Sequence, residues 1–227
     1  MSDIAVIGGT GALGGALAQR LAAAGIAVVV GSRDPAKAEI FADEVRQKYP
    51  AATISGAGLA DAAAQAQICF VTVPYAAQLD TLGVIAPHVA GKIVVDATVP
   101  LRPPKVGTVQ LPASGSAVVD GAAILGEGVR VVSALQNVAA DKLGSAAEIE
   151  SDVLICGDDA AAVEEVRELL GRIGLRSWHA GPLANSAATE AMTSLLIQIN
   201  RRYKIAHGGI RITGTPMDGA PQADGAK

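Results

Sequence analysis

The 227-residue sequence is poor in aromatic and charged side chains, which make up 3% and 18% of it, whereas 50% of its residues are hydrophobic. Its 18 lysines and arginines against 22 acidic residues give a net charge of −4, which offers no basic surface for nucleic acid. No hydrophobic run approaches the roughly 20 residues that a membrane-spanning helix needs. Because a strand pattern begins near the N-terminus, we expect no secretory signal. These absences predict a cytoplasmic protein that binds neither nucleic acid nor a membrane.

Cysteine is also scarce, and histidine shows no metal-binding pattern. Cys69 and Cys156 each lie within a hydrophobic, strand-like run, so we expect buried structural thiols and neither a disulfide nor a nucleophile. His88, His179 and His207 are scattered and lack the spacing of metal ligands. The sequence therefore predicts no metal site.

Short β-branched runs alternate with alanine-rich helical patterns along most of the chain. This alternation predicts an α/β fold with a mostly parallel sheet, because parallel strands are joined by crossover helices. The predicted strands cover residues 4–7, 27–30, 53–55, 68–73, 92–96, 129–134, 153–156 and 177–179. The predicted helices cover residues 13–24, 35–48, 59–66, 78–86, 117–125, 160–170 and 186–203. Asp34 before Pro35 is the expected N-cap of the second helix.

The order of these elements predicts a Rossmann-type, doubly wound domain over residues 1–134. A smaller C-terminal α/β portion over residues 135–214 is expected to close the substrate cleft. The small, polar segment 215–227 is expected to be a disordered tail. Residues 98–115 interrupt the pattern with four prolines, and this loop either closes over a second substrate or forms a rigid surface connection.

The last predicted helix has a hydrophobic face at helical spacing and cations at its C-terminal end. The face is formed by Ala188, Met192, Leu195, Ile199 and Tyr203. We expect it to be core or a subunit interface and not a cofactor site. The cations Arg201, Arg202 and Lys204 either stabilise the helix dipole or bind an anionic coenzyme tail, and both interpretations stay open.

The first strand leads directly into a glycine-rich segment with the spacing G-x-G-x-x-G. The three glycines are Gly9, Gly11 and Gly14, and Thr10, Ala12 and Leu13 stand between them. Such glycines allow a tight turn, a close approach of the backbone to a pyrophosphate, and close packing of helix and strand. The N–H groups at the start of the following helix favour the negative phosphates. Its position between a strand and a helix predicts dinucleotide binding.

The end of the second strand indicates which dinucleotide is bound. NAD enzymes place an acidic residue there for the ribose hydroxyl, whereas this chain has Ser32 and Arg33, with Lys37 one helical turn later. A hydroxyl, a guanidinium and an ammonium bind a 2′-phosphate, which a carboxylate would repel. The chain is therefore expected to bind NADP. The mechanism of short-chain dehydrogenases is excluded, because Tyr49, Tyr75 and Tyr203 all lack a lysine four residues later.

These residues resemble the F420-dependent NADP oxidoreductases (NADPH:F420 reductases), and the resemblance extends from residue 4 to about residue 214. The similar segments after the glycine turn and Ser32 are residues 72–75, 92–96, 131–138, 156–159, 180–183 and 200–204. The resemblance implies hydride transfer between NADPH and the deazaflavin coenzyme F420. It implies that the turn holds the pyrophosphate, and that Ser32, Arg33 and Lys37 hold the 2′-phosphate.

The resemblance also implies a nicotinamide site. Val73 and Pro74 would line the cofactor beyond the fourth strand, and Gln136, Asn137, Val138 and Ala140 would approach the nicotinamide. Two positions depart from the family's usual residues, since Gln136 stands where members often have His and Tyr75 where they often have Trp. Glutamine can bond a carboxamide but cannot carry a proton at neutral pH.

No catalytic side chain is required, because hydride transfer is the chemistry of the two coenzymes. Three functions stay open: hydride transfer between NADP(H) and F420, NADPH-dependent reduction of a flavin or other small acceptor, and NADP sensing without catalysis. Members of the family commonly associate, so a homo-oligomer is expected.

Overall fold

The structure of the chain, a computed structural model, describes residues 4–145 and 147–214. The predicted tail, residues 215–227, lies outside these ranges. Eight strands form one sheet in the order β3-β2-β1-β4-β5-β6-β7-β8. The strands are β1 (Ile4–Ile7), β2 (Val28–Ser32), β3 (Ile54–Gly58), β4 (Ile68–Val71), β5 (Ile93–Asp96), β6 (Arg130–Ser133), β7 (Val153–Gly157) and β8 (Ser177–His179). Neighbouring strands are parallel except β6 and β7, which confirms the predicted α/β, Rossmann-type, mostly parallel sheet.

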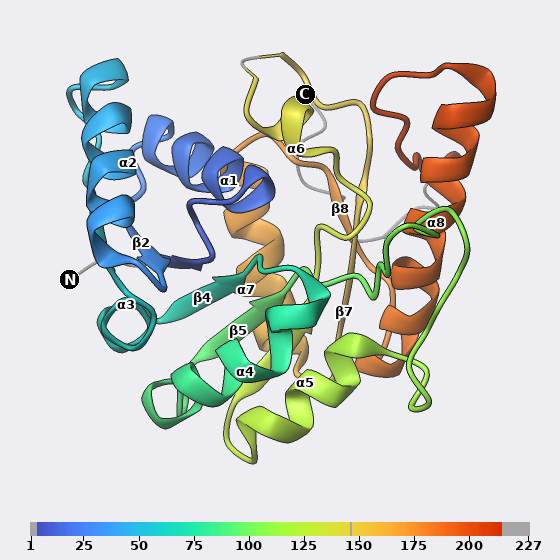
Figure 1. Cartoon of the computed structure of the whole chain (residues 1–227), viewed down its shortest axis with the longest axis horizontal. Helices are drawn as coiled ribbons and strands as arrows, with labels where there is room; N and C mark the ends of the chain where they lie inside the picture. Colours follow the sequence, from blue (N-terminus) through green and yellow to red (C-terminus); the bar gives the residue numbers. More distant parts are fainter. Residues whose placement is uncertain (1–3, 146, 215–227) are drawn as a thin grey trace.

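Helices cover both faces of the sheet (Figure 1). One face packs against α1 (Ala12–Ala23), α2 (Pro35–Lys48), α6 (Ala140–Leu143) and α7 (Ala160–Arg172). The other packs against α3 (Leu59–Gln65), α4 (Tyr75–Ile85) and α5 (Ala117–Leu125), and α8 (Ser186–Tyr203) lies beyond α5. Two short 3₁₀ helices, Ala86–His88 and Leu183–Asn185, precede β5 and α8. Alternate strand residues supply the two cores: Ile4 and Val6 face one, and Ala5 and Ile7 the other.

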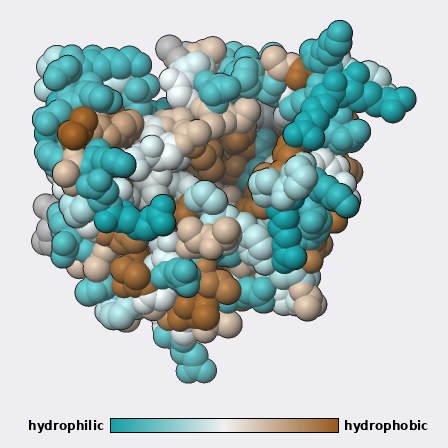
Figure 2. All heavy atoms as spheres, viewed as in Figure 1, coloured by the Kyte–Doolittle hydropathy of each residue, from teal (hydrophilic) through white to brown (hydrophobic). Residues whose placement is uncertain are grey.

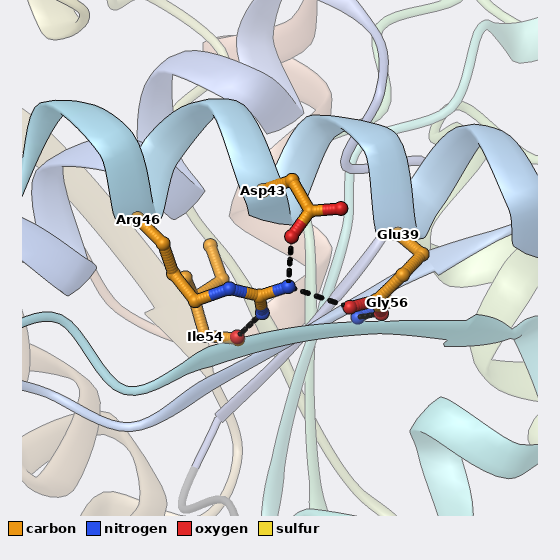
Figure 3. Close-up of polar contacts among 5 residues, drawn as sticks. All are labelled: Glu39, Asp43, Arg46, Ile54 and Gly56. Carbon is orange, nitrogen blue, oxygen red and sulfur yellow. Dashed lines mark hydrogen bonds and ion pairs between the residues drawn. The ribbon is translucent and has the colours of Figure 1, made fainter. Parts of the chain in front are cut away.

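Strand β3 is an edge strand, and a polar cluster fixes it to α2 (Figure 3). The Arg46 guanidinium donates to the Ile54 carbonyl and to the carboxylates of Glu39 and Asp43, with N–O distances of 2.7 and 2.6 Å for the two carboxylates. Glu39 also accepts from the Gly56 N–H at 2.7 Å, and these bonds from Arg46 and Gly56 lower the pKa of its carboxyl. The cluster thereby fixes the edge strand to the helix that follows β2, and β2 lies between β3 and β1.

Most predicted elements are confirmed, with the largest differences at four places. The fourth strand ends at Val71 instead of residue 73, and the following helix begins at Tyr75 instead of residue 78, because Pro74 serves as its N-cap. The third strand extends to Gly58 instead of residue 55. The sequence prediction missed α6, which is a single short turn of helix. Asp34 caps α2 as predicted, by accepting from the Lys37 N–H at 3.3 Å.

Helix α8 lies with its polar side toward the rest of the chain. Ser186, Thr189, Glu190 and Ser194 are buried, whereas Leu195, Ile199 and Tyr203 are 51%, 42% and 66% exposed. The prediction that the hydrophobic face is core is therefore wrong for the single chain. Its alternative, a subunit interface, stays a prediction.

The sheet continues across the domain boundary predicted at residue 134. Strand β7 pairs with β6 through Val132–Gly157 and Ser133–Cys156, and one core cluster joins residues from Ile4 to Leu175. The division into a domain and a smaller portion stays a prediction. Both cysteines are free and buried as predicted, and burial raises the pKa of each thiol to about 11. No helix among residues 4–145 and 147–214 combines the length and hydrophobicity needed to cross a bilayer.

Candidate functional site: the carboxyl edge of the parallel strands

The glycine-rich turn lies where β1 ends and α1 begins. Gly8 has φ of +80° and accepts from the Gly11 N–H at 2.9 Å, which closes the turn. A Cβ at Gly9 would meet the Val6 carbonyl at 2.7 Å, and one at Gly14 would meet the Gly8 carbonyl at 2.6 Å. Side chains are therefore excluded at both positions, as the motif requires.

The middle of the turn faces open space. Thr10, Gly11 and Ala12 are exposed, and no side chain of the described residues caps the α1 N-terminus, where Gly11 is the N-cap. A Cβ at Gly11 would meet only the Gly8 carbonyl, at 3.2 Å. This cradle of free backbone N–H groups fits a pyrophosphate, which it could approach without hindrance.

Strand β2 ends beside this turn, because β1 and β2 are parallel neighbours. The Gly8 N–H donates to the Gly31 carbonyl at 2.8 Å, which fixes the turn to the strand. Ser32 is buried and its hydroxyl accepts from the Asp34 N–H, whereas Arg33 is exposed. The Lys37 ammonium is 3.9 Å from the Asp34 carboxylate, so one acidic group lies among the cations.

A cavity of about 160 Å³ brings these segments together. It is lined by Gly8, Thr10, Gly11, Ser32, Arg33, Leu59, Thr72, Val73, Pro74, Ala77 and Thr81. Six of the predicted residues thus share one cavity: Thr10, Gly11, Ser32, Arg33, Val73 and Pro74. The other nine predicted residues do not line it: Gly9, Ala12, Leu13, Gly14, Lys37, Gln136, Asn137, Val138 and Ala140.

The residues of this cavity that sequence reasoning missed are mostly ordinary helix residues. Leu59 begins α3, and Ala77 and Thr81 lie on consecutive turns of α4. Nothing in their local sequence distinguishes them from core positions, because their role follows from the packing of α3 and α4 around the end of β4. Thr72 follows β4 directly, and its hydroxyl donates to the Ile7 carbonyl at 2.8 Å. Its position at a strand end next to the glycine turn could have identified it from the sequence as a site residue.

The predicted nicotinamide segment follows β6 at the same edge of the sheet. Gln136 is buried, and its amide nitrogen donates to the Asp96 carbonyl and the Ser133 hydroxyl, each at 2.9 Å. Its amide oxygen is buried and has no hydrogen-bond partner among the residues that the structure describes. A buried acceptor without a partner is costly, and the carboxamide N–H₂ of a nicotinamide is the kind of donor that fits it.

Asn137 next to it has both of its amide protons occupied. They bond the Thr189 carbonyl at 2.9 Å and the Thr193 hydroxyl at 3.0 Å, and both acceptors lie on α8. The Asn137 side chain therefore contacts α8. The cofactor contact that the family resemblance implies for Asn137 stays a prediction.

Two buried carboxyls lie behind this edge. Asp96 accepts from Gln78 at 2.6 Å and from the Thr98 N–H at 2.9 Å, and burial raises the pKa of its carboxyl. Glu190 accepts from the Ser116 hydroxyl and from the N–H groups of Ala117 and Val118 at the start of α5. Burial raises the pKa of Glu190, and the nearby Asp96 adds to the shift.

The proline-rich loop, residues 98–115, passes between the start of α4 and α8 (Figure 1). The Arg102 guanidinium lies over the Tyr75 ring at 5.5 Å, and the Thr108 carbonyl accepts from Ser194 of α8 at 3.4 Å. In the same view the surface is hollowed between α1 and α8, with hydrophobic residues on the floor of the hollow (Figure 2). The loop thus borders the hollow, and both interpretations of its role stay open.

Comparison with known proteins finds F420-dependent NADP reductases among the similar proteins. A family model described as NADP oxidoreductase, coenzyme F420-dependent, matches residues 3–100. A protein of Methanothermobacter thermautotrophicus named F420-dependent NADP reductase is 40% identical, over 94% of this chain and 95% of that protein. Its counterpart of the same name from Methanothermobacter marburgensis is 38% identical, over 94% of this chain and 99% of that protein.

A solved structure is similar over nearly the same length. It comes from Arthrobacter sp. FB24, and its description suggests an F420-dependent NADP-reductase. It superposes with a TM-score of 0.80 at 28% identity, over 94% of this chain and all of that one. The similarity therefore includes the C-terminal elements β7, β8 and α8 as well as the glycine turn.

Proposed function

Because the chain belongs to the family of coenzyme F420-dependent NADP oxidoreductases, we propose that it transfers hydride reversibly between NADP(H) and F420. The two coenzymes supply the hydride chemistry, and the protein binds, orients and shields them. The observation that carries the proposal is the cavity shared by the glycine turn, the end of β2 and the end of β4. It combines a phosphate cradle with a cationic side chain, and none of the described residues that line it is acidic.

The proposed NADP site extends along the carboxyl edge of the sheet. The turn holds the pyrophosphate through Gly9, Thr10, Gly11, Ala12, Leu13 and Gly14. Ser32, Arg33 and Lys37 bind the 2′-phosphate; of these, Ser32 and Arg33 line the cavity. Lys37 is close to Asp34 and contributes through its charge at longer range.

The nicotinamide end of the proposed site lies between β4 and β6. Val73 and Pro74 support the ring side of the cofactor, and the 136–140 segment, with Gln136, Asn137, Val138 and Ala140, approaches the nicotinamide. The unpartnered oxygen of Gln136 supports this assignment, because it offers an acceptor for the carboxamide. Glutamine in this position orients the ring and takes no part in proton transfer.

The test is an acceptor comparison. The protein is mixed with NADPH and with oxidised F420, FMN or FAD, and the absorbance of each acceptor is followed. Turnover with F420 is the expected result. Turnover with a flavin alone would make the chain an NADPH-dependent flavin reductase, and NADPH binding without any turnover would make it an NADP sensor.

We also propose that the protein is a cytoplasmic homodimer that pairs through the hydrophobic face of α8. Leu195, Ile199 and Tyr203 leave this face exposed on the single chain, and pairing two such faces would remove it from water. Replacing Leu195 and Ile199 together by Glu should convert a dimer to a monomer in sedimentation velocity. Leu79→Glu, at an exposed hydrophobic residue on α4, is the matched control and should leave the mass unchanged. A monomeric wild-type protein would contradict the proposal.

A further inference from the structure

The turn that follows β6 is held in a conformation that L-residues rarely adopt. Leu135 is buried and has φ of +74°, and its carbonyl accepts from the Val138 N–H at 3.2 Å. Leucine at positive φ is strained, because its Cβ crowds the backbone. Such strain persists only where surrounding contacts over-determine the backbone, and it accumulates at functional sites. Gln136 follows directly, so the conformation of Leu135 sets the direction in which the Gln136 side chain leaves the backbone.

The contacts that hold this turn come from helix α8. The Thr193 hydroxyl donates to the Gln136 carbonyl at 2.9 Å and accepts from the Asn137 amide at 3.0 Å. The second Asn137 proton bonds the Thr189 carbonyl. The turn and the helix are more than 50 residues apart in the chain, so these bonds form a tertiary clasp and not local structure.

Helix α8 is itself fixed against the sheet by a different set of bonds. One turn away from Thr193, the buried Glu190 accepts from Ser116 at 2.6 Å and from two N–H groups at the start of α5. Ser116 also bonds Ser186 at 2.7 Å. The clasp therefore joins the strained turn to a helix whose position is already determined.

We propose that Thr193, acting with Asn137, is a positioning residue for hydride transfer: the α8 clasp holds the strained turn and thereby keeps the buried Gln136 amide in place at the nicotinamide end of the proposed site. This inference rests on the proposed function. It gives the polar face of α8 a role in the reaction, and it makes the Asn137 side chain a support of the site. Hydride transfer is sensitive to such support, because reacting atoms must be held near attack distance and a 1 Å displacement costs about 100-fold in rate.

The first test variant is Thr193→Val, which keeps the branched shape and removes the hydroxyl. Hydrogen–deuterium exchange of residues 135–139 in the coenzyme-free protein should become faster. The hydride-transfer rate from NADPH to F420 should fall about tenfold relative to wild type. The isotope effect on kcat, measured with NADPH deuterated at C4, should rise. The affinity for NADP⁺, measured by calorimetry, should change less than about threefold, because the pyrophosphate and 2′-phosphate contacts remain.

Three further variants control this result. Thr193→Ser restores the hydroxyl and should restore exchange and rate. Ser194→Ala removes a hydroxyl from the next residue of α8, which bonds the proline-rich loop and not the turn, and should change neither. Asn137→Ala removes the same clasp from the side of the turn. The hydride-transfer rate of the double variant with Thr193→Val should therefore be no lower than that of the slower single variant. Asn137→Ala also serves as the test if Thr193→Val does not fold.

Unchanged exchange and rate in Thr193→Val, or equal losses in Ser194→Ala, would overturn the inference. A loss of NADP⁺ affinity as large as the loss of rate would also overturn it, since Thr193 would then support binding alone. Failure of the proposed function would look different, because the wild-type protein itself would not reduce F420.

Discussion

Arg33 is the side chain on which the choice between NADP and NAD depends. It is exposed, follows the last residue of β2 and lines the same cavity as the glycine turn. Replacing Arg33 by Ala should weaken NADPH binding by tenfold or more, because a charged hydrogen bond to the 2′-phosphate contributes about 1.5 to 3 kcal/mol. NADH binding should change little, since NADH has no phosphate there. Fluorescence titration with both cofactors measures the difference.

Two variants on α2 serve as controls for the Arg33 result. Lys37→Ala should have a smaller effect, because Lys37 is outside the cavity lining and close to Asp34. Lys48→Ala, at the far end of the same helix, should have none. If Arg33→Ala weakens NADPH and NADH equally, the assignment of the 2′-phosphate site is wrong.

Asp152 gives the stability of the protein a pH dependence. Burial alone would raise the pKa of this carboxyl, but hydrogen bonds from Arg176, the Ile212 N–H and Trp178 outweigh burial and hold the pKa below its ordinary value. A lowered carboxyl pKa contributes stability that is present above the unfolded value, about 3.9, and is lost as the pH falls through the folded value. These bonds join the start of β7, β8 and the segment after α8.

Asp152→Asn should therefore lower the free energy of unfolding at pH 7 by about 2 kcal/mol, because charged hydrogen bonds of a buried group are lost. The difference from wild type should shrink as the pH falls below about 4 and the wild-type carboxylate takes up its proton. Urea unfolding at pH 7, 4 and 3 measures this. Glu164→Gln, at a half-exposed carboxylate that pairs with Arg167, should cost less than about 1 kcal/mol. A difference that grows toward low pH would contradict the assignment.

Helix α8 illustrates what hydropathy can and cannot predict. Its bounds, residues 186–203, agree with the sequence prediction, because helical periodicity and composition depend on local sequence. The side that is buried was not predicted, because the partners of Thr189, Glu190 and Thr193 lie in segments more than 50 residues away. The hydrophobic face of a helix predicts burial only where the polar face of the same helix has no buried hydrogen-bond partners. The role of Gln136 was assigned by resemblance, whereas the strain at Leu135 is visible only in the backbone.

Arg20 on α1 joins three helices. Its guanidinium donates to the carbonyls of Ile173 at 2.7 Å and Ser145 at 2.9 Å, and to that of Leu143 at 3.4 Å. Leu143 ends α6 and Ile173 is the C-cap of α7, so the cation lies at two helix C-termini, where the helix dipoles favour it. Burial lowers the pKa of this guanidinium, which nevertheless stays charged at neutral pH.

Arg20→Met keeps most of the side-chain length and removes every donor. It should lower the free energy of unfolding by about 2 to 3 kcal/mol, because carbonyls at two helix ends lose a charged donor. Arg20→Lys should restore only part of the loss, since one ammonium cannot reproduce the planar set of donors. Arg172→Ala, at an exposed residue near the same end of α7, is the control. Equal effects of Arg20→Met and Arg172→Ala in urea unfolding would contradict this role.

The continuous sheet bears on whether the protein unfolds as one cooperative unit or as two. The Rossmann order of β1 to β6 followed from the glycine turn and the alternating pattern, whereas the antiparallel addition of β7 and β8 had no local signal. Strand direction depends on the path of the long connection between residues 134 and 152, whose described residues contain only the short helix α6. The pairing of β6 with β7 involves two residue pairs, but the shared core cluster runs from Ile4 to Leu175. A shared core predicts one cooperative transition.

The two buried thiols can measure this cooperativity. Cys69 lies in β4 and Cys156 in β7, on either side of the predicted boundary, and neither thiol is accessible in the folded chain. With Cys69→Ala and Cys156→Ala, the remaining thiol of each variant reports one side. Both thiols should react with a disulfide reagent only when the whole chain unfolds. For each variant, the free energy of opening obtained from reaction rates in increasing urea should therefore equal the free energy of global unfolding. Reaction of Cys156 at a clearly lower free energy than Cys69 would show instead that the portion after residue 134 opens by itself, as a separate domain does.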